Sequence, residues 1–121
     1  MPGSITPMIH VPDVREAADW YRDLGFVLTG FHSLDGAWTW ARLTLGDGAV
    51  MFGAGGLPSL AHRREVDLYV GVDDGLDALF DGLKDRVDVF QPPHDTEHGM
   101  REFVIRDLNR FWITFGQPAP T

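Results

Sequence analysis

The chain has 121 residues, of which 44% are hydrophobic and 23% charged, a length and composition that suit one globular domain rather than a disordered segment. Its 18 acidic and 10 basic residues give a formal charge of −8, which disfavours nucleic acid and anionic membrane surfaces as partners and weakly favours small cationic ligands. It contains no cysteine, which excludes disulfide bonds, thiolate metal ligands and cysteine nucleophiles.

The pattern at the start of the chain predicts a strand and a helix. Residues 4–10 form a β-rich run, and Asp13 then offers an N-cap with Glu16 three residues later, which is the capping-box spacing. Apolar residues follow at helical spacing until Gly25, a residue type that commonly ends helices. A helix is therefore expected between Asp13 and Gly25.

Three strands are predicted next, over residues 26–31, 37–45 and 49–53. A polar turn at residues 34–36 separates the first two, and Gly46-Asp47-Gly48 is a strong hairpin turn between the second and the third. Residues 53–62 are rich in Gly, Ala and Pro and are interpreted as a linker within the domain.

The second half of the chain repeats this order of elements. Asp73 or Asp74 can cap a helix whose apolar residues recur at helical spacing over residues 76–83. A polar loop with two prolines is expected at residues 91–99, and a turn at residues 107–109. The predicted strands cover residues 66–72, 87–90, 100–106 and 110–115.

Two modules of the order strand, helix and three strands indicate an internal duplication and an α+β fold. We expect a single domain over residues 1–121, with module one at about residues 1–57 and module two at about 62–121. The two βαβββ modules would form a cupped mixed sheet with the helices on its outer face. The other face of the sheet is then either solvated or a concave binding surface.

That second face carries unusual side chains. Strand alternation places there Thr6, Met8, His10, Trp38, Trp40, Arg42, Met51, Asp67, Tyr69, Trp112 and Thr114. Solvated sheet faces rarely expose so many aromatic rings, so we expect something to cover them. They form a second core, a dimer interface, or the walls of a ligand cup with a few polar anchors.

Several polar residues have two interpretations each. His10 can anchor a ligand or be a satisfied interior histidine. Asp67 interrupts an apolar strand, where it either forms a structural ion pair with Arg42 or Arg101 or recognises a cationic group of a ligand. Glu102 is a candidate general base if the protein is an enzyme.

His94 and His98 are four residues apart, the spacing of two metal ligands on one helix face. The neighbouring Pro92, Pro93 and Gly99 favour a surface loop instead. Because this loop precedes the closing strands, His98 could form part of a lip over the cup.

Two segments carry a family resemblance, VPDVREAADWYRDLGF in the first module and REFVIRDLNRFWITF in the last. They resemble the strand-to-helix signature and the closing hairpin of the vicinal oxygen chelate superfamily, which includes glyoxalase I, extradiol dioxygenases, fosfomycin-modifying enzymes and bleomycin-binding resistance proteins. The hairpin is most similar to the bleomycin-binding version, although Asp107-Leu108-Asn109-Arg110-Phe111 lacks the proline and glycine of the usual Asp-Pro-x-Gly-Asn. The resemblance covers nearly the whole chain and implies paired βαβββ modules, commonly in a homodimer.

The metal-dependent enzymes of the family carry His, Glu or Gln ligands at four positions that face the cup. The resemblance assigns those positions to Thr6, Met51, Asp67 and Thr114. Only Asp67 suits a divalent metal, because Thr hydroxyls and a Met thioether are poor ligands in such sites. The resemblance therefore favours the antibiotic-binding branch, without a cofactor, over glyoxalase or dioxygenase chemistry.

The favoured hypothesis is a non-catalytic protein that binds and sequesters a small planar natural product, with a cationic one favoured by charge. Its expected ligand-binding residues are His10, Trp38, Trp40, Arg42, Asp67, Tyr69, His98 and Trp112. The alternative is a lyase, isomerase or dioxygenase with a relocated divalent metal held by His10, Asp67 and Glu102. A third hypothesis is a small dimeric domain whose aromatic face is only an interface.

The expected location is the cytoplasm. The chain does not begin with a basic region followed by a long apolar run, and no apolar stretch approaches the roughly 20 residues of a membrane helix. A cysteine-free chain also fits a reducing compartment. The expected partners are a small-molecule ligand and a second copy of the chain.

Overall fold

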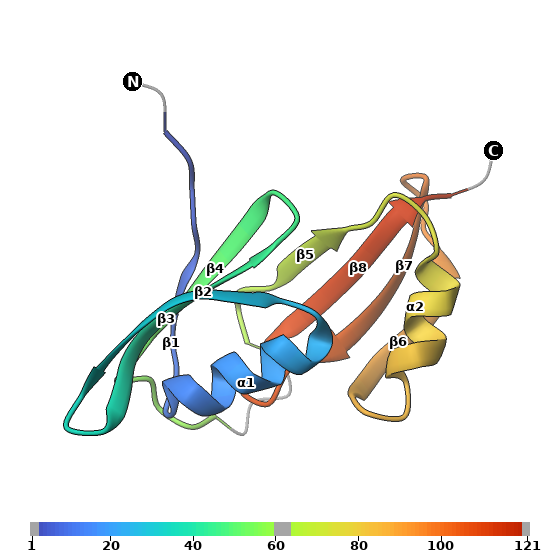
Figure 1. The fold of residues 1–121 in the computed structure, drawn as a ribbon. Coiled ribbons are helices and arrows are strands. Elements are labelled where there is room, and N and C mark those ends of the chain that lie inside the picture. The colour runs from blue at the N-terminus through green and yellow to red at the C-terminus, as the bar shows by residue number, and fades with distance from the viewer. Residues whose placement is uncertain (1–2, 60–63, 120–121) are drawn as a thin grey trace. The chain divides into compact units, whose positions relative to one another are not determined.

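The computed structural model describes residues 3–59 and 64–119. The chain divides into two compact units, Met1–Ser59 and Leu60–Thr121, called unit 1 and unit 2 below. Each unit has the order strand, helix and three strands (Figure 1), which confirms the α+β fold and the two βαβββ modules. Residues 60–62 of the expected linker lie outside the described residues.

Unit 1 consists of β1 (Met8–His10), α1 (Val14–Leu24), β2 (Val27–Leu34), β3 (Ala37–Leu45) and β4 (Gly48–Gly53). The strand order is β1-β4-β3-β2, with β1 parallel to β4 and the other neighbours antiparallel. β1 is shorter than the predicted strand, and β2 is longer. The hairpin between β3 and β4 turns at the predicted place, with Gly46 at a φ of 56°.

The ends of α1 are those predicted from the sequence. The amide of Glu16 donates a hydrogen bond to the Asp13 carboxylate over 3.0 Å, and Gly25 ends the helix at a φ of 117°. The helix buries Val14, Ala17, Ala18 and Tyr21. The ring of Tyr21 packs 4.8 Å from that of Phe52 on β4, so the unit 1 core lies between α1 and one face of the sheet.

Unit 2 consists of β5 (Leu68–Gly71), α2 (Leu76–Leu83), β6 (Asp88–Asp95), β7 (Met100–Arg106) and β8 (Trp112–Pro118). The strand order is β5-β8-β7-β6, with β5 parallel to β8. Phe103 is fully buried between Phe80 of α2 and Phe115 of β8, with ring centroids 5.2 and 4.8 Å away. The core again lies between the helix and one sheet face.

The start of α2 differs from the prediction. Neither Asp73 nor Asp74 is the N-cap; that position belongs to Gly75, whose φ is 76° and which has no side chain to cap with. The amide of Leu76 instead donates to the Gln117 side-chain oxygen of β8 over 2.9 Å. A distant strand therefore supplies the hydrogen bond that a local side chain supplies in α1.

The expected polar loop at residues 91–99 is also partly wrong, because β6 continues to Asp95. Its pairing with β7 has irregularities between Val89 and Gln91 and between Gln91 and His94. The second irregularity contains the two prolines, and β6 is an edge strand, where a residue without an amide hydrogen is tolerated. His94 accordingly lies on a strand.

A β-bulge in unit 1 overturns the predicted position of Trp38. Trp40 pairs with His32 and Trp38 with Ser33, so Thr39 is an extra residue in β3, and its hydroxyl donates to the His32 carbonyl over 3.3 Å. The extra residue reverses the alternation, so Trp38 faces the helix side of the sheet. There its ring stacks on Phe31 at 4.2 Å, under the Arg15 guanidinium of α1 at 5.4 Å.

The turn between β7 and β8 is built around a buried aspartate. Asp107 is 5% exposed, and its Oδ1 accepts hydrogen bonds from the amides of Asn109 at 2.7 Å and Phe111 at 3.0 Å. Arg110 takes a φ of 71°. The predicted turn is confirmed without the proline and glycine of the family pattern. In the part of the chain that the structure describes, neither helix is long and apolar enough to cross a membrane.

Candidate functional site

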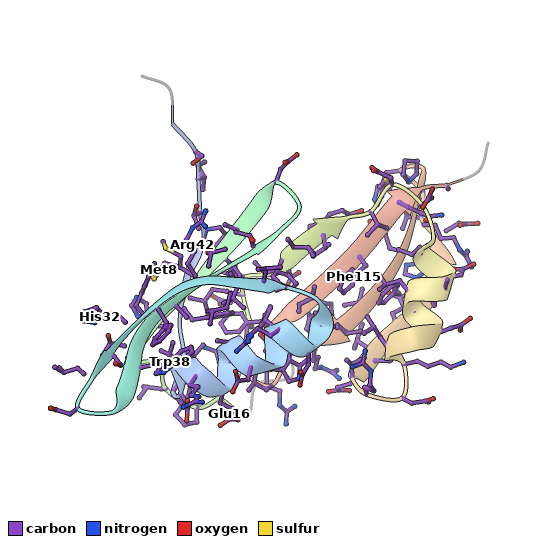
Figure 2. The ribbon with its side chains drawn as sticks, viewed as in Figure 1. Met8, Glu16, His32, Trp38, Arg42 and Phe115 are labelled. Atoms are coloured by element: carbon purple, nitrogen blue, oxygen red, sulfur yellow. The ribbon has the colours of Figure 1, made fainter. Side chains whose placement is uncertain are left out.

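In unit 1 the sheet face opposite α1 carries both aromatic and polar side chains. Ile9, Ala41 and Phe52 are buried on the helix side, so the residues that alternate with them point to the opposite face. We call this the open face of unit 1; it carries Met8, His10, Trp40, Arg42 and Met51. Figure 2 shows Met8 and Arg42 on this side of the strands and Trp38 near the start of α1.

The indole of Trp40 is fixed on this open face. Its Nε1 donates to the Met51 sulfur over 3.3 Å. The far edge of the ring lies against the backbone of Gly30 on β2, where an added Cβ would be 3.3 Å from the ring. Trp40 therefore presents a flat surface whose orientation is held by both neighbouring strands.

Polar groups of the same face are also held in place. The Nδ1 of His10 lies 3.0 Å from the Ala54 carbonyl oxygen. Since a carbonyl only accepts, Nδ1 is the donor, and in the neutral ring Nε2 is then an acceptor. The Arg42 guanidinium donates to the Thr29 hydroxyl over 3.0 Å. This face thus offers an acceptor, a cation and a ring within one sheet.

Unit 2 has a corresponding open face opposite α2. Ile113 and Phe115 are buried on the helix side, and alternation and strand pairing place the neighbouring side chains on the other side. We call this the open face of unit 2; the side chains used below are Tyr69, Phe90, Glu102, Arg106, Trp112 and Thr114.

One part of this face is an aromatic pair next to an arginine. The rings of Phe90 and Trp112 lie 4.2 Å apart with their planes tilted by 32°. The Arg106 guanidinium sits 5.0 Å from the Phe90 ring and 3.3 Å from the Asp88 carboxylate. The pair is a stacking surface with its own cation and counter-ion.

The other part is a hydrogen-bonded group around Glu102. The Tyr69 hydroxyl donates to Glu102 Oε2 over 2.7 Å, and the His98 Nε2 lies 3.2 Å from the same oxygen. The hydroxyl end of the Tyr69 ring occupies the space that a Cβ at position 116 would need, so only Gly116 allows this placement. Tyr69 itself is exposed, whereas Glu102 is buried.

These contacts determine how Tyr69 ionises. Burial of its hydroxyl, and then the hydrogen bond to Glu102, raise the pKa of Tyr69 from 10.0 to about 12. Ionisation would remove the donated hydrogen and place a second negative charge beside the carboxylate. At neutral pH Tyr69 is therefore a neutral donor.

Most of the ligand-binding residues expected from the sequence lie on one of the two open faces, and three lie elsewhere. His10, Trp40 and Arg42 lie on the open face of unit 1, and Tyr69 and Trp112 on that of unit 2. The exceptions are Trp38, on the helix side of unit 1; His98, in the turn before β7; and Asp67, exposed just ahead of β5.

Other expected pairings have different partners in the structure. Arg101 points toward the helix side of unit 2, where it binds Asp77 of α2 at 3.0 Å and Asp95 of β6 at 3.1 Å. These two carboxylates, rather than Asp67, are the counter-ions seen for this arginine.

Three residues of the open face of unit 2, Phe90, Glu102 and Arg106, are not among those that the sequence pattern assigns to it. Phe90 was placed at the end of a strand without a face, because the irregularity after Val89 cannot be located from sequence. Glu102 is expected from the sequence as a general base or as a ligand of a relocated metal, without a place on this face. The alternation of β7 would have placed it on this face, with Val104 and Arg106 as its neighbours on the same strand.

The four positions that hold metal in the family's enzymes do not offer a suitable donor set. Met51 lies on the open face of unit 1, Thr114 on that of unit 2, and Thr6 and Asp67 precede β1 and β5. Two hydroxyls, a thioether and one carboxylate do not fit the divalent metals of those enzymes. Over residues 3–59 and 64–119, no three His, Asp or Glu side chains come together as metal ligands.

The comparison with family models decides the family. The model described as Glyoxalase/Bleomycin resistance protein/Dioxygenase superfamily matches residues 5–115. The chain belongs to this superfamily. None of the curated proteins compared with the chain matches it.

Solved structures with a similar fold cover 96% or more of the chain. TioX from Micromonospora sp. ML1 is 28% identical, with a TM-score of 0.75 over 96% of this chain and 99% of its own. TnmS3, an antibiotic binding protein from Streptomyces sp. CB03234, is 24% identical, with a TM-score of 0.72 over 98% and 99%. The bleomycin-binding protein from bleomycin-producing Streptomyces verticillus, complexed with copper(II)-bleomycin, is 21% identical, with a TM-score of 0.70 over the full length of both chains.

Proposed function

We propose that this chain is a non-catalytic member of the superfamily that binds and sequesters a small planar natural product, preferably a cationic one. The observation that carries the proposal is that each open face presents an aromatic surface in a defined orientation, Trp40 in unit 1 and the Phe90–Trp112 pair in unit 2. A planar ligand stacks on such surfaces.

The way in which Trp40 is held supports binding rather than incidental exposure. A ring already fixed by Met51 and Gly30 loses little conformational freedom when a ligand stacks on it, so more of the stacking free energy appears as affinity. His10 and Arg42 are likewise fixed, and they supply an acceptor and a donor for polar groups of the ligand. The formal charge of −8 favours a ligand of positive charge.

We also propose that the protein holds no resident metal, that it forms a homodimer and that it is located in the cytoplasm. Thr and Met at the family's ligand positions support the first part. Exposed apolar side chains of the edge strand β2, namely Val27, Phe31 and Leu34, support a partner surface. The antibiotic binding of TnmS3 and of the Streptomyces verticillus protein supports the ligand class, as a property of those relatives.

Ligand titration tests the proposal. Bleomycin and a panel of planar natural products are titrated into the protein while tryptophan fluorescence and the melting temperature are recorded. A true ligand quenches fluorescence, and at about 100 times its Kd it adds roughly 2.7 kcal/mol of apparent stability. Light scattering on the same samples measures the expected dimer.

Single substitutions identify the rings involved. Trp40→Ala and Trp112→Ala are each expected to weaken binding by about 1–3 kcal/mol in a protein that remains folded. Trp38→Ala is the matched control, since its ring lies on the helix side, and it should leave the affinity unchanged. The proposal is wrong if no compound of the panel binds, or if the Trp40 and Trp112 variants bind like wild type. Near-stoichiometric divalent metal in untagged protein would favour the metal-dependent lyase, isomerase or dioxygenase instead.

A further inference from the structure

Glu102 is an acidic group with an unusual set of neighbours. It lies on β7, an interior strand of the unit 2 sheet, and is only 9% exposed. Both of its hydrogen bonds, from Tyr69 and from His98, end on Oε2. Among the described residues, no hydrogen bond is donated to Oε1. Glu102 lies on the open face, and the acceptor capacity of its second oxygen is not used by these two donors.

The part of the chain that the structure describes places no permanent counter-ion beside the Glu102 carboxylate. Within the described ranges no lysine or arginine forms an ion pair with it, and its one basic neighbour is His98. The arginines of the same strand are engaged elsewhere, Arg101 with Asp77 and Asp95, and Arg106 with Asp88. A carboxylate removed from water gains most from a cation brought to it.

Tyr69 supplies a second element that suits a cation. Its ring stands beside the carboxylate, 54% exposed, with its hydroxyl directed at Glu102. An exposed aromatic face attracts cations as well as planar groups. Because the pKa of Tyr69 is raised to about 12, its hydroxyl remains a donor and adds no competing negative charge.

We propose that Glu102 and Tyr69 form a recognition site for a cationic nitrogen group of the ligand, an ammonium or an amidinium, on the open face of unit 2. The site rests on the proposed function and narrows its ligand class. The cation binds Oε1 and lies against the Tyr69 ring. His98, whose side chain is 65% exposed, is the donor that a bidentate amidinium displaces from Oε2.

The test compares benzamidine with benzamide, which have nearly the same shape but differ in charge. Each compound is titrated to about 10 mM, a range suited to small fragments, and backbone amide shifts are followed by NMR. Benzamidine is expected to shift the amides of Tyr69, His98 and Glu102, and to bind at least about tenfold more tightly than benzamide, a difference of about 1.4 kcal/mol.

Two charge-matched variants separate the site from general attraction to an acidic protein. Glu102→Gln removes the charge but keeps an acceptor for Tyr69, and it should weaken benzamidine binding at least about tenfold. Glu97→Gln removes the same charge from the exposed turn before β7 and should change binding by less than about twofold. Tyr69→Phe keeps the ring and is expected to retain preference for benzamidine over benzamide.

The results distinguish failure of the cation site from failure of the proposed function. Equal binding of benzamidine and benzamide by the wild type, or shifts confined to unit 1, overturns the cation site even if Glu102→Gln fails to fold. Unchanged affinity in a folded Glu102→Gln variant also overturns it. If planar natural products still quench tryptophan fluorescence in these cases, the proposed function stands without the cation site. If benzamidine binds as expected but no planar natural product does, the proposed function falls.

Discussion

Units 1 and 2 have the same order of elements. They are alike on the helix side of their sheets and differ on the open face. Under the helices the packing is alike, with Tyr21 against Phe52 in unit 1 and Phe80 against Phe103 in unit 2. The open faces are chemically different: unit 1 presents thioethers, a histidine, an arginine and a tryptophan, and unit 2 combines an aromatic pair with the buried carboxylate of Glu102. Burial constrains the helix side to apolar groups of fitting volume, whereas the open face is free to change its ligand chemistry.

The largest expected difference between the units concerns their closing hairpin turns. Asp107 is buried and accepts two backbone hydrogen bonds, whereas Asp47 in the corresponding turn of unit 1 is exposed. Asp107→Ala should lower the free energy of unfolding by about 1–3 kcal/mol, because two amides lose their acceptor. Asp47→Ala should change it by less than about 0.5 kcal/mol. Urea denaturation measures both, and equal effects would contradict this distinction.

The helix caps give a second, smaller contrast. Asp13→Ala removes a local cap of α1 and should cost about 0.5–2 kcal/mol. Gln117→Ala should cost about 1 kcal/mol and also loosen the start of α2 from β8, because the cap of Leu76 comes from that strand. Amide hydrogen exchange distinguishes the two: exchange at Leu76 should accelerate only in the Gln117 variant. Unchanged exchange there would show that the cap of α2 lies elsewhere.

The ionisation of Tyr69 is the most local prediction. Ultraviolet titration should find this tyrosine ionising near pH 12 rather than 10.0, and Glu102→Gln should lower its pKa, because a neutral amide repels tyrosinate less than a carboxylate does. Tyr69→Phe identifies the signal, since the other tyrosine of the chain is the buried Tyr21. A Tyr69 pKa that is the same in the Glu102 variant would show that this hydrogen bond is not formed in solution.

The same shift predicts the direction of the pH dependence of stability. The pKa of Tyr69 is higher in the folded chain than the value of 10.0 expected for the unfolded one. Its contribution to stability is therefore complete below about pH 10 and is lost as the pH rises toward about 12. Between these pH values the wild type should lose more stability than Tyr69→Phe, and a parallel decline of the two would contradict the assignment.

Local signals in the sequence predicted most elements of the fold. Asp13 and Gly25 set the ends of α1 as expected, and the hairpin turns at Gly46 and Asp107 lie where they were predicted. Each of these features depends on residues within a few positions of one another, so the chemistry that decides it is visible in a short window. The cap of α2 was not predicted, because Gln117 is distant in sequence from Leu76.

For the candidate site, sequence alternation alone placed His10, Trp40, Arg42, Tyr69 and Trp112 on open faces, and the tertiary structure decided the rest. Alternation fails at Trp38 because Thr39 is an extra residue in β3. The side chain that precedes Thr39 therefore points to the opposite face from the one that simple alternation predicts. The group of Tyr69, His98 and Glu102 needs three strands in register, with Gly116 leaving space for the ring. Such contacts join residues from separate parts of the chain, and only the paired strands of unit 2 bring them together.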